Sequence, residues 1–275
     1  MRWRVALLAA LVLGACTKAA PQPEARAPLF RVSDGDTTVW LVGGMHLLPP
    51  EVRWRTPSVE RAIEESQELV LESSSEDKAD FAGVAKGQGL KPIADRVPPA
   101  DRKALDLLIT ETGVPRATLD GQKSWAAATT LATGYAMKFG ATIDNGVETV
   151  LWRAFAGRER AAFYKAQDQI AMLDALPPDL QDQMLAKALE PSEGYLTVLN
   201  AWERGDLHAL DPTSDCSPLA GRLVGQPNNR WANWIAARMK RPGTVLVAVG
   251  AGHLAGPYAL QDMLRARGLK VERVQ

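Results

Sequence analysis

The stretch from Thr37 to Leu47 reads TTVWLVGGMHL, and it decides the fold. Its first seven residues are mostly β-branched or apolar and follow a Gly-Asp pair, so they predict a buried β-strand over 37–43. Near the other end of the chain, Thr244–Val249 reads TVLVAV and predicts a second buried strand. Glycines follow both runs, and glycine lets the backbone turn sharply where a strand ends.

Helices and further strands flank these two runs. Thr56 is a good N-cap and Pro57 suits the first position of a helix, which the sequence therefore predicts between 57 and the strand ELVLE at 68–72. The residues that share one face of this helix are Val59, Ala62, Ile63 and Ser66. The amino-terminal part of the chain thus has a strand-helix-strand order.

The middle of the chain, from about 100 to 234, has mostly helical periodicity. Two apolar helix faces consist of Leu105, Leu108 and Ile109, and of Trp125, Ala128, Ala132 and Phe139. A last helix is predicted over 254–267, ended by Gly268, and a last strand over 271–274. We therefore expect an α/β (α+β) fold, in which the terminal segments form a central mixed sheet surrounded by helices, with a large helical middle section.

Composition excludes several classes of function. The 32 Lys and Arg balance the 32 Asp and Glu, so there is no basic surplus of the kind that marks a nucleic-acid-binding protein. No apolar run reaches the roughly 18 residues of a membrane-spanning helix. The sequence also lacks a phosphate-loop lysine motif, a G-x-S-x-G elbow, an H-E-x-x-H motif and paired C-x-x-C motifs.

The first residues have the order of a secretory signal. Arg2 and Arg4 precede a short apolar run over 5–13. The run ends Leu-Gly-Ala-Cys16, which resembles the bacterial lipobox, and this predicts removal of residues 1–15 and acylation of Cys16. The alternative is an ordinary signal peptide with a chance cysteine.

Residues 16–28 contain few large apolar side chains and are predicted to form a flexible tether before a single domain at 29–275. A lipid anchor would hold this domain at the periplasmic face of a membrane in the cell envelope. Thr17, rather than aspartate, follows the cysteine, which favours the outer membrane if the cell is Gram-negative.

The two buried strands share the ending Gly-x-x-His-Leu, with Gly43 and His46 in one and Gly250 and His253 in the other. Two of the chain's three histidines thus occupy matching positions 207 residues apart. Ligands of such sheets bind beyond the carboxyl ends of strands, so if the two strands are neighbours we expect both imidazoles to face one cleft as metal ligands or as general bases. Glu72, at the end of its strand, is a candidate metal ligand or catalytic base.

Three other features predict no site. His208 lies in a polar segment without a matching partner and is expected at the surface. With Cys16 acylated, Cys216 has no disulfide partner, and a bystander thiol is favoured over a nucleophile. Gly250, Gly252 and Gly256 imitate a dinucleotide-binding turn, but their spacing departs from G-x-G-x-x-G and too little chain follows to complete such a fold.

These motifs resemble the TraB/GumN family, which is related to the Tiki metalloproteases. The resemblance covers about 29–275. Its motifs are LFRVSDGDTTVWLVGGMHLLPP at 29–50, LVLESS at 69–74, NGVE at 145–148, AWERGD at 201–206 and VLVAVGAGHLAG at 245–256. Where the family has threonine, an acid, aspartate and arginine, this chain has Gly44, Tyr164, Glu148 and Pro227.

The resemblance implies that His46, His253 and Glu72 hold a divalent metal, with Mn²⁺ or Co²⁺ expected and Zn²⁺ possible, and that the reaction is peptide-bond hydrolysis. The resulting hypothesis is a metal-dependent hydrolase, anchored in the envelope, that acts on a peptide or small molecule. One alternative is a binding protein, because the wider superfamily includes a haem-binding lipoprotein. Another is a scaffold without turnover. Most tryptophans, including Trp125, Trp152 and Trp234, are better explained as core.

Overall fold

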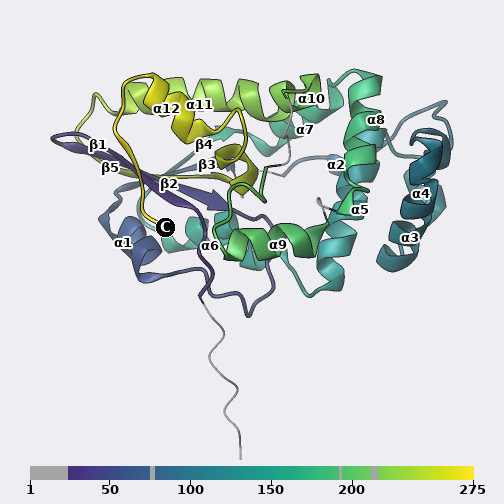
Figure 1. Cartoon of the computed structure of the whole chain (residues 1–275), viewed down its shortest axis with the longest axis horizontal. Coiled ribbons are helices and arrows are strands. Elements are labelled where there is room, and N and C mark those ends of the chain that lie inside the picture. Colours follow the sequence, from purple (N-terminus) through teal and green to yellow (C-terminus); the bar gives the residue numbers. More distant parts are fainter. Residues whose placement is uncertain (1–23, 75–77, 192–193, 212–215) are drawn as a thin grey trace, which may run out of the picture.

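The computed structural model describes residues 24–74, 78–191, 194–211 and 216–275. The predicted signal peptide, Cys16 and the first part of the predicted tether lie outside the described residues. The described strands form one mixed six-stranded sheet in the order β4-β3-β5-β2-β1-β6 (Figure 1). In chain order they are β1 (Leu29–Ser33), β2 (Thr37–Gly44), β3 (Glu68–Ser73), β4 (Glu159–Tyr164), β5 (Gly243–Gly250) and β6 (Val271–Arg273). The predicted α/β fold is confirmed.

The two strands that carry the matching motifs are direct neighbours. β2 and β5 are parallel, and Gly44 of β2 lies opposite Gly250 of β5. β3 pairs with β5 on the other side, also in parallel. Since parallel strands end at the same edge of a sheet, the carboxyl ends of β2, β5 and β3 lie side by side.

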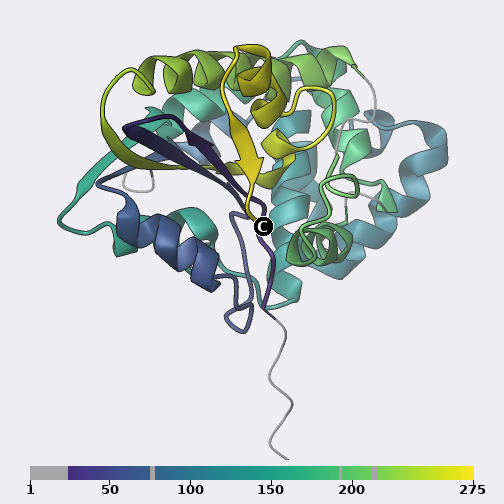
Figure 2. The ribbon, with the colours of Figure 1, turned by 60° about the vertical axis from the view of Figure 1, so that its left-hand side comes forward.

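The sheet is covered on both faces (Figure 2). Trp40 and Val42 of β2 pack on one face, while Val39 and Leu41 pack on the other, as expected for a strand buried on both sides. The first core contains residues of α1 (Pro57–Glu65), α6 (Val147–Ala154) and α9 (Tyr195–Glu203). The second contains residues of α11 (Gln226–Arg238) and α12 (Leu260–Ala266).

The middle section is largely helical, as predicted. Its remaining described α-helices are α3 (Arg102–Thr112), α4 (Arg116–Asp120), α5 (Ser124–Lys138), α7 (Ala166–Asp174), α8 (Pro178–Lys187) and α10 (Pro218–Ala220), and α2 (Phe81–Ala85) precedes this section. Short 3₁₀ turns are η1 (Ile93–Asp95), η2 (Pro99–Asp101), η3 (Ile143–Asn145) and η6 (Ala251–Leu254), and η5 (Gly221–Gly225) is a π-helix. No described helix is both long and apolar enough to cross a bilayer.

The structure differs from the predicted secondary structure in two places. β4 lies within the section predicted as helical, because its sequence ERAAFY is rich in helix formers and parallel pairing with β3 overrides that preference. The predicted helix over 254–267 begins only at Leu260, because Gly256 has a φ of +70° and Pro257 follows it.

The described residues just before β1 are packed on the domain. Ala25 and Ala27 are buried. The backbone N–H of Ala25 donates to the Arg53 carbonyl at 2.8 Å, and that of Arg26 donates to the Glu203 carbonyl at 2.7 Å. Alanine lacks the bulk that marks a core residue in a sequence, yet it fills small spaces against a domain.

Candidate functional site

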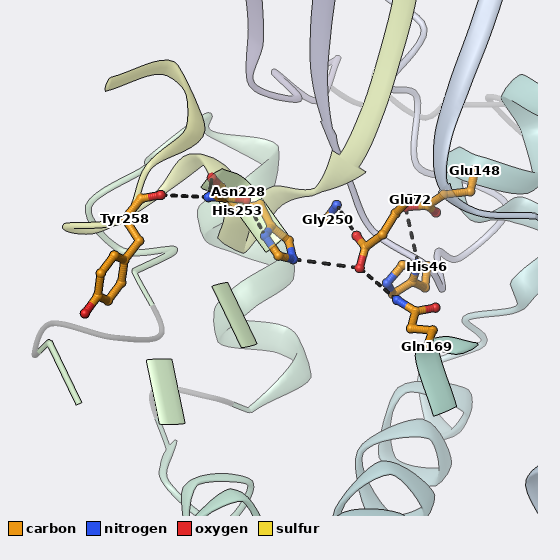
Figure 3. A network of polar contacts seen from close by, with 8 residues as sticks. All are labelled: His46, Glu72, Glu148, Gln169, Asn228, Gly250, His253 and Tyr258. Carbon is orange, nitrogen blue, oxygen red and sulfur yellow. Dashed lines mark hydrogen bonds and ion pairs between the residues drawn. The ribbon is translucent and has the colours of Figure 1, made fainter. Parts of the chain in front are cut away.

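The predicted site residues gather at the carboxyl edge of β3, β5 and β2 (Figure 3). Glu72 is the last residue but one of β3, His253 lies in η6 directly after β5, and His46 follows β2 by two residues. The predicted convergence of the two Gly-x-x-His motifs and Glu72 is therefore present in the structure.

Glu72 is the central group of this site. Its side chain is buried, and the Gln169 amide donates to Oε1 at 2.8 Å while the Gly250 N–H donates to Oε2 at 3.2 Å. Oε1 also lies 3.8 Å from His253 Nε2, which is an ion-pair distance and too long for a hydrogen bond. The Glu72 carboxylate is thus held in place by hydrogen bonds from α7 and from β5.

His253 is enclosed by α11. Its Nδ1 lies 2.7 Å from Asn228 Oδ1, and its ring centroid lies 4.5 Å from that of Trp231. Burial lowers the pKa of His253, and nearby Glu72 only partly opposes this effect. The imidazole is therefore held neutral, which is the form that binds metals.

His46 has a different environment. Its side chain is 58% exposed, and Nδ1 lies 3.2 Å from Oε1 of the buried Glu148, at the start of α6. The charge of Glu148 raises the pKa of His46, while desolvation opposes this and solvent screens part of the interaction. Burial is the largest single influence and raises the pKa of Glu148, but the charge and the close approach of His46 act together against it, so the pKa of Glu148 is lowered overall.

Glu148 has unused hydrogen-bonding capacity. Within the described residues, neither of its carboxylate oxygens has a hydrogen bond of good geometry, because the approach of His46 is close in distance but poorly aligned. Burying a carboxylate without well-formed hydrogen bonds costs free energy unless another group supplies the missing interactions. This makes Glu148 a candidate to support a positive charge in the site.

Glycines create the space for this arrangement. A Cβ on Gly44 would lie 2.9 Å from Glu148 Oε1 and 3.1 Å from Val147 Cβ, and one on Gly146 would clash with the His46 carbonyl. A Cβ on Gly43, the first motif glycine, would lie 2.9 Å from the Leu254 side chain. The glycine at 44 leaves room for the Glu148 side chain.

Two of the three predicted metal ligands, Glu72 and His253, lie at a separation that one divalent ion can bridge. His253 Nε2 and Glu72 Oε1 are 3.8 Å apart, and one ion bound at about 2.0–2.2 Å from each atom would span such a gap. His46 lies near this pair, since its charge acts on His253 and that of Glu72 acts on His46. In the described ranges, however, no group of three or more His, Cys, Asp or Glu side chains is already arranged to hold a metal.

The other sequence features lie outside this set. His208 is exposed, as predicted, and so is the free thiol of Cys216. Tyr164 is the last residue of β4, and its buried hydroxyl has no hydrogen bond among the described residues. Trp125 is fully buried, and Trp152 and Trp234 pack against the two cores.

Sequence reasoning assigned no role in the site to Glu148, Gln169 and Asn228. Glu148 ends the NGVE segment and Asn228 follows Pro227, both of which were named in the family resemblance, whereas no quoted segment contains Gln169. Glu148 follows Gly146, whose contact with the His46 carbonyl requires glycine. Asn228 adjoins Pro227 at the start of α11. Their contacts depend on how α6, α7 and α11 approach the sheet, which periodicity does not reveal.

The comparisons with known proteins agree with the motifs. Residues 28–273 match the TraB/PrgY/gumN family, so the chain belongs to that family. It is 24% identical over 240 residues to the uncharacterized protein YbaP of Escherichia coli strain K12, covering 84% of this chain and 89% of YbaP. It is also 24% identical over 234 residues to YbaP of Shigella flexneri, covering 82% of this chain and 87% of that protein. No solved structure matches the chain.

Proposed function

We propose that this protein is a metal-dependent hydrolase of peptide bonds, with its site at the edge of β3, β5 and β2. The supporting observation is the convergence of Glu72 and His253, 3.8 Å apart, with His46 beside them. A mixed imidazole and carboxylate set suits several first-row divalent ions, and family resemblance favours Mn²⁺ or Co²⁺ over Zn²⁺. Glu72, His253 and the exposed His46 would hold the ion, and His46 would release its proton on binding it.

The bound ion would supply an activated water and polarise the scissile carbonyl. The carboxylates of Glu72 and Glu148 would then have different roles. Glu72 accepts hydrogen bonds through both of its oxygens, from Gln169 and Gly250, which orients it as a ligand. Glu148 contacts His46 and keeps its negative charge there, so it would orient His46 and balance positive charge in the site.

Metal analysis combined with digestion of a peptide library tests this function. We expect metal and cleavage in the wild-type protein, and loss of both in His253→Ala and Glu72→Gln. His208→Ala is the matched control, because it removes the exposed histidine and should change neither readout. Equal metal content in all four proteins would contradict the site. Bound metal without cleavage of any peptide would contradict the peptidase and favour the ligand-binding alternative.

We further propose that a lipid on Cys16 anchors this domain in the cell envelope. The support is the basic flank, short apolar run and Leu-Gly-Ala-Cys sequence at 13–16. Metabolic labelling with a fatty acid, in a Gram-negative host, should label the wild-type protein but not Cys16→Ser. Cys216→Ser is the control and should retain the label. Equal labelling of the wild type and Cys16→Ser would contradict the anchor.

A further inference from the structure

Asn228 makes three hydrogen bonds that tie α11 to the segment after β5. Its side chain is fully buried. The amide Nδ2 donates to the His253 carbonyl at 2.8 Å and to the Tyr258 carbonyl at 2.7 Å, while Oδ1 lies 2.7 Å from His253 Nδ1 (Figure 3). Both the NH₂ group and the oxygen of this amide are therefore engaged with the loop after β5.

The two carbonyls fix the orientation of the amide. A carbonyl oxygen can only accept, so the group that faces the carbonyls of His253 and Tyr258 must be the NH₂ of Asn228. Turning the amide over would bring Oδ1 against two carbonyl oxygens and break both bonds. The atom facing His253 Nδ1 is consequently an oxygen, which has no hydrogen to donate.

An imidazole nitrogen that faces an acceptor at 2.7 Å must carry the hydrogen of that bond. We propose that Asn228 is a positioning residue that selects the Nδ1–H tautomer of His253 and so leaves the Nε2 lone pair facing Glu72. The use of this lone pair to bind a metal rests on the proposed function, whereas the tautomer itself does not. Outer hydrogen bonds of this kind orient metal-binding histidines in other proteins.

The local fold brings Asn228 to this position. The π-helix η5 (Gly221–Gly225) directly precedes α11, and π-helical turns are frequent at functional sites. A Cβ on Gly225 would lie 3.0 Å from the Tyr258 ring, so glycine allows that ring to pack closely. Tyr258 in turn presents its carbonyl to Asn228. The loop after His253 and the start of α11 are therefore fitted to each other.

Loss of the Asn228 amide should change which ring nitrogen of His253 carries the proton. Within the described residues, the other acceptor that the ring faces is Glu72 Oε1, 3.8 Å from Nε2. Without an acceptor at Nδ1, the neutral imidazole gains more by protonating Nε2 and donating toward this carboxylate. The lone pair would then point away from Glu72, and the ring would present N–H where a cation is to bind.

Long-range ¹H–¹⁵N correlation spectra of the metal-free protein test the tautomer directly. We expect His253 to carry its proton on Nδ1 in the wild type and to shift toward Nε2–H in Asn228→Leu. Asn228→Asp keeps an acceptor for Nδ1–H and should keep the wild-type tautomer, even though it loses both donated bonds. Asn229→Leu is the matched control, because Asn229 bonds Arg267 at the surface instead.

Titration with Mn²⁺ provides the second readout. Asn228→Leu should bind Mn²⁺ about 10–100-fold more weakly than the wild type, and Asn229→Leu should bind it equally well. An Nε2–H tautomer in the wild type, or an unchanged Nδ1–H tautomer in Asn228→Leu, would overturn the inference. The expected tautomers in a protein that binds no Mn²⁺ would support the inference and contradict the proposed function.

Discussion

At the scale of single residues, the site separates two acidic side chains with opposite environments. Glu72 is held by Gln169 and Gly250, while Glu148 meets His46 and has no well-aligned hydrogen bond among the described residues. The two histidines differ in the same way. Burial favours the neutral form of His253, and the charge of Glu148 favours the protonated form of His46. The two copies of the Gly-x-x-His motif thus place their histidines in different electrostatic environments.

The protonation of His46 should depend on Glu148. Because the negative charge of Glu148 raises the pKa of His46, Glu148→Gln should lower that pKa toward the ordinary value of 6.5. The ring-proton shifts of His46, followed by NMR as the pH is varied, measure this change. Glu272→Gln, at the far edge of the sheet, should leave the titration of His46 unaltered. An unchanged His46 titration in Glu148→Gln would show that the pair does not interact.

The close approach of Glu148 to Gly44 should make that glycine sensitive to substitution. Gly44→Ala places a methyl group 2.9 Å from the carboxylate and 3.1 Å from Val147, and overpacking of this kind costs about 1–3 kcal/mol. Urea unfolding measures the loss. Gly35→Ala is the control, since no atom lies within 4 Å of its added Cβ. Equal stability of the two variants would contradict the tight fit at Gly44.

At the scale of elements, α9 supports the loop that carries His46. The buried indole of Trp202 donates to the Gly43 carbonyl at 2.8 Å, and the Tyr195 hydroxyl donates to the Leu47 carbonyl at 3.2 Å. One helix thus bonds the backbone on both sides of His46. This explains physically why the AWERGD segment belongs with the Gly-x-x-His motif, although the two are far apart in the sequence.

Removing the indole donor should destabilise the fold. Trp202→Phe leaves the Gly43 carbonyl buried without its partner, which costs about 1–3 kcal/mol beyond the lost packing. Trp40→Phe is the matched control, because Trp40 is buried in the same core but its Nε1 has no hydrogen-bond partner among the described residues. Chemical unfolding should show a larger loss for Trp202→Phe than for Trp40→Phe. The reverse order would contradict the role given to the bond.

Tyr195 should make the protein sensitive to alkali. Burial raises its pKa from 10.0 to about 12, so the neutral hydroxyl stabilises the fold fully below pH 10 and loses this effect as the pH rises through about 12. Between these values the wild type should lose more stability than Tyr195→Phe, as measured by urea unfolding at each pH. Tyr135→Phe serves as the control and should behave like the wild type. Parallel pH profiles for the wild type and Tyr195→Phe would refute the assignment.

At the scale of the whole molecule, the site depends on strands from both ends of the chain. The alternation of Val39, Trp40, Leu41 and Val42 between two cores shows why the runs at 37–43 and 244–249 were recognisable from sequence. The convergence of both histidines was expected from the shared motif if the two strands are neighbours, and the sheet order shows that they are. β4, Gln169 and Asn228 were not predictable as parts of the site, because their roles arise from tertiary approach rather than from periodicity or residue type.

A cation held between β3 and β5 should stabilise the whole domain. Binding to the folded state alone raises the free energy of unfolding by about 2.7 kcal/mol at a ligand concentration 100 times Kd. Thermal unfolding with increasing Mn²⁺ should therefore shift upward by several degrees in the wild type and far less in Glu72→Gln. Mg²⁺ at the same concentration controls for ionic strength. Equal shifts in both proteins would place the ion elsewhere.

The neighbouring position of β2 and β5 has a consequence for synthesis on the ribosome. β2 emerges early, but its parallel partner β5, which begins at Gly243, is made only near the end of translation. Until then β2 and β3 each lack the strand that joins them, and nascent chains with such open edges are prone to misassociate. We expect truncated products that stop before Gly243 to be degraded rather than to accumulate as a smaller folded protein.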